Sequence, residues 1–465
     1  MTRLIFCKKP MGILTIVMVL FVFSPVFSDE KEQEAEEPAS EVQEIASQQE
    51  QENEEVSPQF VVFRVEGNTE PQSLSWILSA VNKRRNGDNS KAKITFFANG
   101  LNLQNSRKVL RKAYRKGHEI GNHTFSGFVD TVGERIDARF LDEAAWFEEI
   151  HQNDSLLRAN LRIPKKRLVG FLAPRLEYNE GAFRAIRRQQ NIIYDASIQE
   201  ADFVAPFDLE HGSRTDSLWA QTRRNEGFRT AGKHKGLWVI PTLQWIVPHD
   251  SLAATYGFEA GLRQRSFAAD NTFDTISGRT TGTDLRLIGT SAIGGFDMKA
   301  NEAAATIKHS FHGAMEAGVP FSFPITAFLY VAKNDRSAVF AGNHRERRKM
   351  IEGVMDYMLS FENVRFVRGK DLIQKIKATQ GIETEDYDYY EEMSDKELMK
   401  LEISEELEEV EETIEETIEV VQNPEENQEE TVETETLNKE ETNEESNETV
   451  ENTEEVKEEV QNEND

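Results

Sequence analysis

The chain has 465 residues and a formal net charge of −29 at pH 7, because 83 Asp and Glu outnumber 54 Lys and Arg. Its one cysteine, Cys7, lies before the first apolar run. The remainder of the chain therefore has no thiol, which excludes thiolate catalysis, disulfides and cysteine zinc sites there.

Residues 1–28 are typical of a secretory signal. Arg3, Lys8 and Lys9 precede an apolar run over residues 13–23, and smaller side chains follow it. We therefore expect an exported protein, either periplasmic or extracellular. The alternative is an uncleaved segment that anchors the chain in the membrane, although the run is shorter than the roughly 20 residues of a spanning helix.

The negative charge is concentrated at the two ends of the chain. Residues 29–57 hold 12 acidic and 1 basic side chain, and residues 381–465 hold 36 acidic and 4 basic ones. Residues 58–380 carry a net charge of +11. We expect a basic body between acidic, disordered tails. Such a body would be attracted to anionic polymers of the cell envelope, and we expect no nucleic-acid partner.

Within the body, short segments rich in Val, Ile and Phe alternate with longer helix-like segments. The predicted strands are residues 60–65, 94–99, 169–173, 191–196 and 237–241, and the predicted helices are residues 73–83, 106–116, 141–151 and 182–189. This alternation predicts parallel β/α units. About 320 residues are ample for one large core, so we expect a single domain.

The most informative motif is Gly-His-Glu-Ile-Gly-Asn-His-Thr at residues 117–124, which follows Ile-Thr-Phe-Phe at residues 94–97. His123 is a candidate metal ligand. A metal that activates water needs about three protein ligands and an open position. A second histidine four residues on would be the natural partner, but position 127 is glycine.

This arrangement resembles the polysaccharide deacetylase family, also called the NodB homology domain or carbohydrate esterase family 4. Eight consecutive positions, 117–124, agree with the family motif, and further landmarks follow in family order from Phe60 to Lys377. The resemblance implies a distorted (β/α) barrel of about seven parallel strands, with the site at their carboxyl ends. It also implies metal-assisted hydrolysis of N-acetyl groups on a sugar polymer.

In that family an Asp and two His hold the metal, a second Asp acts as the general base, and an Arg orients this base. The first motif falls on the end of the first predicted strand, where Glu66 takes the metal-binding position. The base position is Val65, or Arg64 if the strand slips by one. Neither side chain can accept a proton from water. The orienting Arg corresponds to Leu172, so its loss accompanies that of the base.

Two further family roles fall on the later part of the body. Arg175 corresponds to a position whose backbone N–H binds the oxyanion, and this role does not depend on the side chain. The general acid is expected near residues 320–330, which contain no histidine. His309 and His312 lie upstream with helical spacing; they either share a metal or, as we prefer, lie on the surface of the helix before that strand.

Aromatic side chains near the expected site are candidates for stacking on sugar rings. Tyr178 and Trp245 are our candidates for substrate binding, together with Arg175; the alternative for the two aromatics is a place in the core. Residues 248–299 are rich in Gly, Thr, Ser and Asp, and they predict long loops near the mouth of the barrel.

The C-terminal tail begins with a helical pattern. Ser394 and Glu397 have the spacing of a capping box, and apolar residues recur at steps of three and four until Pro424. We predict a helix over residues 394–422 that is able to pair with a partner helix. Beyond it, the composition supports only disorder.

Three functions remain open at this point. The first is an exported deacetylase-like protein that has lost catalysis and binds an envelope glycan such as peptidoglycan; this requires no cofactor and no catalytic residue. The second is an active, metal-dependent N-deacetylase with a rebuilt site, in which zinc would be held by Glu66, His123 and another ligand. The third is an adaptor that acts through its acidic tail. The fold alone does not choose among them.

Overall fold

The structure is a computed structural model that describes residues 57–128, 134–200, 202–210, 232–336, 338–382 and 393–404. These residues belong to one compact unit, Ser57–Asp465. The signal-like segment 1–28, the acidic segment before Ser57 and most of the C-terminal tail lie outside them. Within the described ranges, no helix is both long and apolar enough to cross a bilayer.

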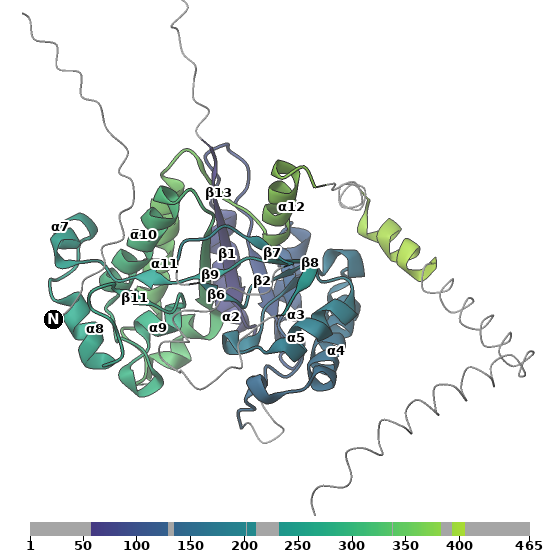
Figure 1. Ribbon diagram of the computed structural model, residues 1–465, viewed down its shortest axis with the longest axis horizontal. Helices are drawn as coiled ribbons and strands as arrows, with labels where there is room; N and C mark the ends of the chain where they lie inside the picture. The colour runs from purple at the N-terminus through teal and green to yellow at the C-terminus, as the bar shows by residue number, and fades with distance from the viewer. Residues whose placement is uncertain are drawn as a thin grey trace, which may run out of the picture. The chain divides into compact units, whose positions relative to one another are not determined.

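A single large sheet organises the body (Figure 1). Its strand order is β12-β1-β2-β3-β4-β5-β8-β7. In addition, β13 pairs with residues 59–61 at the beginning of β1. The seven strands from β12 to β8 run parallel, whereas β7 is antiparallel to β8. The strands are β1 (Gln59–Glu66), β2 (Thr95–Ala98), β3 (Glu119–Asn122), β4 (Gly170–Phe171), β5 (Tyr194–Asp195), β7 (Phe207–Leu209), β8 (His234–Val239), β12 (Phe321–Thr326) and β13 (Val364–Phe366).

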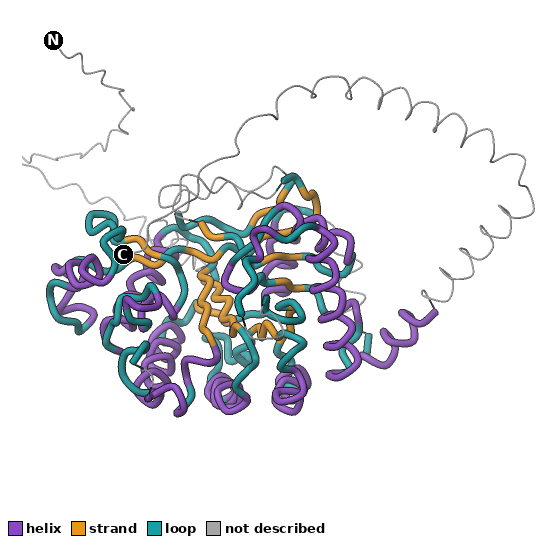
Figure 2. Tube along the Cα trace, turned by 90° about the horizontal axis from the view of Figure 1, so that it is seen from below, coloured by secondary structure: helices purple, strands orange, loops and turns teal. Residues whose placement is uncertain are grey.

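The sheet is curled, and the helices lie around the strands (Figure 2). This arrangement confirms the predicted distorted (β/α) barrel of about seven parallel strands. The helices that follow or flank the strands are α2 (Pro71–Asn82), α3 (Leu103–Arg115), α4 (Glu143–Leu161), α5 (Glu180–Gln189), α10 (Ala300–Glu316), α11 (His344–Leu359) and α12 (Gly369–Thr379).

Local sequence signals explain where several helices begin. Pro71 occupies the first turn of α2, where its missing N–H costs nothing. Asp142 and Asn179 each accept a hydrogen bond from a backbone N–H of the first turn of α4 and α5. Asn343 and Glu346 form a capping box at α11.

The alternation of side chains along β1 separates two layers. Val61, Phe63 and Val65 belong to the largest hydrophobic cluster, which also contains side chains of α2, α10 and α11. Val62 belongs instead to a smaller inner cluster, together with Leu172 and with Leu372 of α12. Arg64 and Glu66 share the face of Val62, because successive residues of a strand point to opposite sides. The concave interior of the sheet is therefore partly charged.

Residues 248–299 differ from the predicted long loops. They contain the short helices α7 (Ala253–Tyr256), α8 (Leu262–Ala269) and α9 (Asp284–Ile288), and strand β11 (Arg279–Thr280), which pairs with β10 (Trp245–Ile246). Each element is too short to produce a clear sequence period.

His309 and His312 lie on the helix α10, as the sequence predicts. Both are half-buried rather than fully on the surface. His312 hydrogen-bonds the hydroxyl of Tyr357 at 2.5 Å, and Tyr256 packs against both imidazoles. This aromatic environment explains their burial without a metal ligand role.

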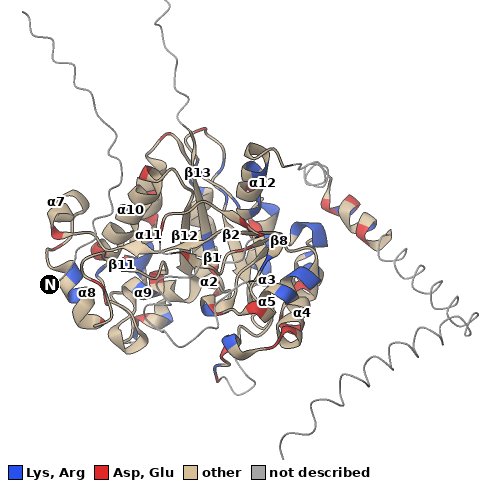
Figure 3. Ribbon diagram, viewed as in Figure 1, with Lys and Arg blue, Asp and Glu red and all other residues tan. Residues whose placement is uncertain are grey.

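A short helix over residues 395–404 lies against the body. Ser394 and Glu397 form the hydrogen bonds of a capping box. The hydroxyl of Tyr114 donates to Asp395 at 2.8 Å, and the backbone N–H of Lys166 donates to Glu402 at 2.9 Å. Figure 3 colours the acidic residues of this helix red. The part of the predicted helix after Ser404 lies outside the described residues.

Replacing Leu398 by Asp is expected to detach this helix, because the Leu398 side chain is fully buried against the body. Amide hydrogen exchange over residues 394–404 should then become at least about tenfold faster, whereas exchange in the sheet should not change. The matched control is Ile403→Asp, since Ile403 is 58% exposed on the same helix. Equal effects of the two substitutions would contradict the docked position of the helix.

Candidate functional site

A cavity of about 810 Å³ lies where the parallel strands β1, β3 and β12 end. This is the edge at which α/β sheets of this kind bind ligands. The cavity is lined by Glu66, Gly67, Thr69, Asn99, His123, Gly127, Arg135, Asp137, Arg139, Pro174, Arg175, Leu176, Glu177, Gln199, Thr281, Thr283, Leu285, Thr326 and Phe328.

Glu66 reaches the cavity from the last position of β1, and its side chain is 11% exposed. Its Oε1 atom lies 3.4 Å from Nε of Arg64. Burial raises the pKa of Glu66 to about 7; the charge of Arg64 opposes this effect, and the charge of Asp284 adds to it. Glu66 therefore lies at the cavity beside the buried Arg64, which shares its face of the strand.

Val65 and Leu172 occupy the positions at which the family resemblance places the general base and its arginine partner. Val65 faces the outer hydrophobic cluster, away from Glu66. Leu172 is fully buried in the inner cluster. Arg64, the alternative base position, shares the inner face with Glu66. None of the three side chains is among those that line the cavity.

His123 follows β3 and lines the cavity. Its Nδ1 lies 2.7 Å from the carbonyl oxygen of Leu172. Because a carbonyl only accepts hydrogen bonds, Nδ1 carries the proton and Nε2 keeps a free electron pair. Burial lowers the pKa of His123 to about 4, so the ring is neutral at pH 7. A neutral imidazole held in this way is suited to accept a hydrogen bond or to bind a metal.

Gly127 lies at the position where a second histidine ligand would be expected. Its backbone has φ of +70°, a conformation that side chains with a Cβ adopt only with strain. Glycine is therefore favoured by the local turn. A ligand at this position would require the loop to change its conformation.

The donor atoms at the cavity do not fit a catalytic metal centre. Glu66 and His123 provide two ligands, whereas such a centre uses about three. Among the residues that the structure describes, no group of three His, Cys, Asp or Glu side chains is arranged to hold a metal ion.

The rim of the cavity carries paired charges. Arg175 has φ of +57°, and its guanidinium donates to the carbonyls of Gly127 and Ile136 at 3.1 and 3.0 Å. Arg135 and Arg175 both form ion pairs with Glu177. Burial, followed by the charge of Arg135, lowers the pKa of Arg175 to about 10. Arg175 therefore holds the rim together through its side chain, in addition to the backbone role expected from the sequence.

Tyr178 and Trp245 do not line the cavity. Tyr178 is 1% exposed and packs edge-on against Phe183, and Trp245 is fully buried in the outer hydrophobic cluster. Their positions correspond to the core alternative. The aromatic side chain that lines the cavity, among the described residues, is Phe328. It follows β12, and sequence reasoning did not select it.

Asp284 is a second buried carboxyl near Glu66 that the sequence did not reveal. It accepts hydrogen bonds from the backbone N–H and hydroxyl of Thr326 and from the hydroxyl of Tyr330. Burial raises its pKa to about 6, against these hydrogen bonds. Its interaction with Thr326 fixes the end of β12 beside Glu66, which is paired in register with Thr326.

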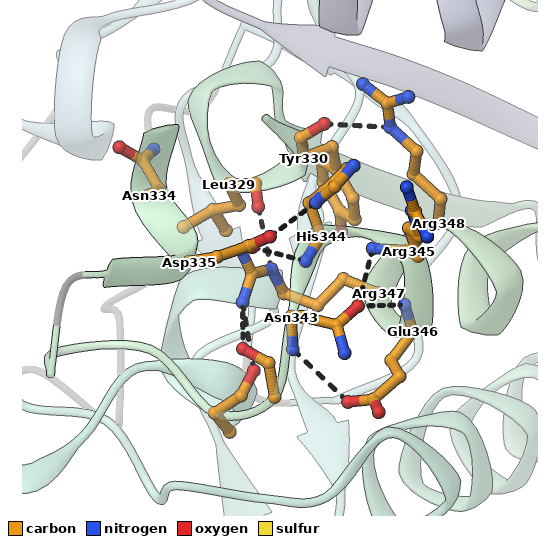
Figure 4. Close-up of polar contacts among 12 residues, drawn as sticks. Leu329, Tyr330, Asn334, Asp335, Asn343, His344, Arg345, Glu346, Arg347 and Arg348 are labelled. Carbon is orange, nitrogen blue, oxygen red and sulfur yellow. Dashed lines mark hydrogen bonds and ion pairs between the residues drawn. The ribbon is translucent and has the colours of Figure 1, made fainter. Parts of the chain in front are cut away.

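The turn that follows β12 is fixed by Arg347 of α11. The buried guanidinium donates to the carbonyls of Leu329 and Gly342, both at 2.7 Å, and it pairs with Asp335 at 3.2 Å. His344 also points toward Asp335 (Figure 4). This network positions the segment that carries Phe328 at the cavity.

The fold is that of an α/β protein of the distorted (β/α) barrel type, with a cavity at the carboxyl ends of its strands. Residues 88–192 match the polysaccharide deacetylase family model, and this match confirms the resemblance to that family. A search of curated proteins returned no match.

Solved structures of polysaccharide and peptidoglycan deacetylases, and of a pseudoenzyme of carbohydrate esterase family 4, align with the chain at low sequence identity. A protein assigned as a polysaccharide deacetylase from Mycobacterium smegmatis is 14% identical, with a TM-score of 0.43 over 70% of this chain and 91% of that chain. The peptidoglycan deacetylase PdaC from Bacillus subtilis is 10% identical, with a TM-score of 0.33 over 70% and 94%. A mutant of the carbohydrate esterase family 4 pseudoenzyme BA3943 is 9% identical, with a TM-score of 0.35 over 68% and 67%.

Proposed function

We propose that this chain is an exported, deacetylase-like protein that binds a glycan of the cell envelope in its cavity without hydrolysing it. The observation that carries the proposal is the set of donors at the floor of the cavity. Glu66 and His123 lack a third ligand among the described residues, and the apolar side chains of Val65 and Leu172 cannot replace a general base and its partner.

The chemistry of the cavity suits a ligand rich in hydroxyl groups. Asn99, Gln199, Thr283 and Thr326 provide neutral donors and acceptors, and Phe328 adds an apolar surface. Glu66 and His123 provide acceptors at the floor. Hydroxyls that donate and accept at short spacing satisfy such a mixed set without leaving a buried charge unpaired.

Export is supported by the signal-like segment 1–28, and attraction to the envelope is supported by the positive charge of the body. The adaptor hypothesis retains the tail beyond Ser404 as its interaction surface, because the helix over residues 395–404 already packs on the body.

Replacing Arg135 by Ala is expected to weaken retention on insoluble peptidoglycan or chitin by about tenfold. The Arg135 side chain is 57% exposed at the rim and holds Glu177 in place, so its loss changes the rim with little effect on the core. The matched control is Arg345→Ala, which removes the same charge from the exposed surface of α11. Sedimentation with the polymer measures retention of the full mature chain.

Absence of wild-type retention on either polymer, or equal losses in the two variants, would refute glycan binding in this cavity. Acetate release from N-acetylglucosamine oligomers should be measured on the same preparation with added zinc. Release that His123→Ala abolishes would instead establish the rebuilt, active deacetylase.

A further inference from the structure

Arg64 is a fully buried cation inside the curled sheet. Its side chain has no exposed surface. One terminal nitrogen donates to the carbonyl of Ala196 at 2.8 Å, and the other donates to the hydroxyl of Thr242. These partners follow β5 and lie in β9 (Thr242–Leu243), so the arginine reaches across the interior from β1. Such a position is costly for a charge unless carboxylates compensate for it.

Two buried carboxyl groups provide that compensation. Glu66 Oε1 lies 3.4 Å from Arg64 Nε, and both of these buried atoms lack a hydrogen-bond partner in the described residues. Burial lowers the pKa of Arg64, and the charges of Glu66 and Asp195 raise it. Asp195 is fixed by hydrogen bonds from the backbone N–H and hydroxyl of Ser197. Oε1 of Glu66 thus faces the guanidinium of Arg64.

We propose that the guanidinium of Arg64 is the built-in cation of this cavity: it balances the charge of Glu66 in place of a metal ion and thereby excludes a divalent cation from Glu66 and His123. The positive charge beside Glu66 repels a second cation. It also occupies one of the two Glu66 oxygens. The other Glu66 oxygen and His123 then remain, which are fewer than the roughly three ligands of a metal centre.

A different role for Arg64 would be to tie β1 to Ala196 and Thr242, with no dependence on Glu66. The two roles differ in the energetic coupling between Arg64 and Glu66: charge balance requires it, and the structural tie does not. The charge-balancing role also predicts a low metal affinity, whether or not the cavity binds a glycan. A result that contradicts this role is therefore distinct from a result that contradicts the proposed function.

The first test is calorimetric titration of the full mature chain with zinc and with cobalt. We expect wild type and His123→Ala to give the same titration, without a stoichiometric site. A site with one metal per chain that is lost in His123→Ala would overturn the proposal. This test uses the intact cavity and does not depend on the folding of any Arg64 variant.

The second test is a double-mutant cycle on thermal unfolding. Arg64→Met should lower Tm by about 5 °C or more, and adding Glu66→Gln to that variant should recover part of the loss. Glu66→Gln alone should not raise Tm. Additive shifts would overturn the charge-balancing role and favour the structural tie. If Arg64→Met does not fold, Arg64→Gln serves in the cycle, because it also removes the charge but keeps a hydrogen-bond donor in the side chain.

Discussion

Replacing Arg347 by Met is expected to lower the free energy of unfolding by about 3–5 kcal/mol. The guanidinium is 1% exposed and satisfies the carbonyls of Leu329 and Gly342 together with Asp335. Methionine fills much of the same volume but donates no hydrogen bond. The carbonyls of Leu329 and Gly342 would therefore lose this donor, and Asp335 would keep, among the described residues, only its contacts with His344, so the turn beside the cavity would lose its support.

Urea unfolding followed by circular dichroism measures this loss, and an unchanged m value would show that both proteins unfold from a similar native state. The control is Arg348→Met at the next position of α11. Arg348 is half-buried and donates to the carbonyl of Tyr330, so its loss should cost about 1 kcal/mol. Similar losses of unfolding free energy in the two variants would mean that the burial of Arg347 adds nothing to its contribution to stability.

Acidification is expected to destabilise the protein through His118, and His118→Asn should remove this effect. The His118 ring is 1% exposed, and its Nδ1 accepts a hydrogen bond from the backbone N–H of Ile94 at 3.3 Å. Burial, followed by the charges of Lys93 and Lys116, lowers the pKa of His118 to about 3. Protonation would place a hydrogen on the atom that accepts from Ile94, so the folded state resists it.

The direction of this pH dependence follows from the pKa of His118, which is lower in the folded state than in the unfolded chain. Between pH 6.5 and pH 4 the unfolded chain binds a proton at His118 and the folded chain does not, so stability falls as the pH decreases, by about 3 kcal/mol. Asparagine keeps an acceptor for Ile94 and does not titrate. The stability of wild type relative to His118→Asn should therefore decrease over this range. A difference that is constant with pH would contradict the burial of a neutral imidazole.

Other buried groups titrate in the same pH range. Their contributions to stability cancel when wild type is compared with His118→Asn. Burial lowers the pKa of His123 to about 4 and raises those of Asp195 and Asp284 to about 6. The two aspartates act with the opposite sign, because a raised pKa gives stability at low pH that is lost as the pH rises through the folded value. All three groups are present in both proteins.

The alternating strands and helices of the body could be predicted because the sequence patterns that indicate them are local. A strand such as β1 is a short apolar run with a turn after it, and the motif at residues 117–124 is contiguous. Helix boundaries follow from capping residues that lie within one turn. The short helices after Trp245 escaped prediction because none spans enough residues to establish a period.

Glu66 and His123 were selected from motifs that are contiguous in the sequence, and the structure places both at the cavity. Their role as metal ligands stays a prediction. Asp284 was missed because its place beside Glu66 depends on Thr326, which is distant from both in the sequence. Tyr178 was selected for its position near the expected site, but the direction of its side chain depends on packing against Phe183. Contacts between distant segments therefore limit what a single sequence predicts.

The first strand of the body, β1, pairs with strands from the far end of the body. It pairs with β12 and β13 as well as β2, and Gln59 hydrogen-bonds the carbonyl of Val319, 260 residues further along the chain. Pairing between strands so far apart in the sequence is expected to slow folding. The first strand cannot complete its pairing before nearly the whole body has been synthesised. For a chain exported as we propose, β1 would therefore lack its partners β12 and β13 until those strands had crossed the membrane.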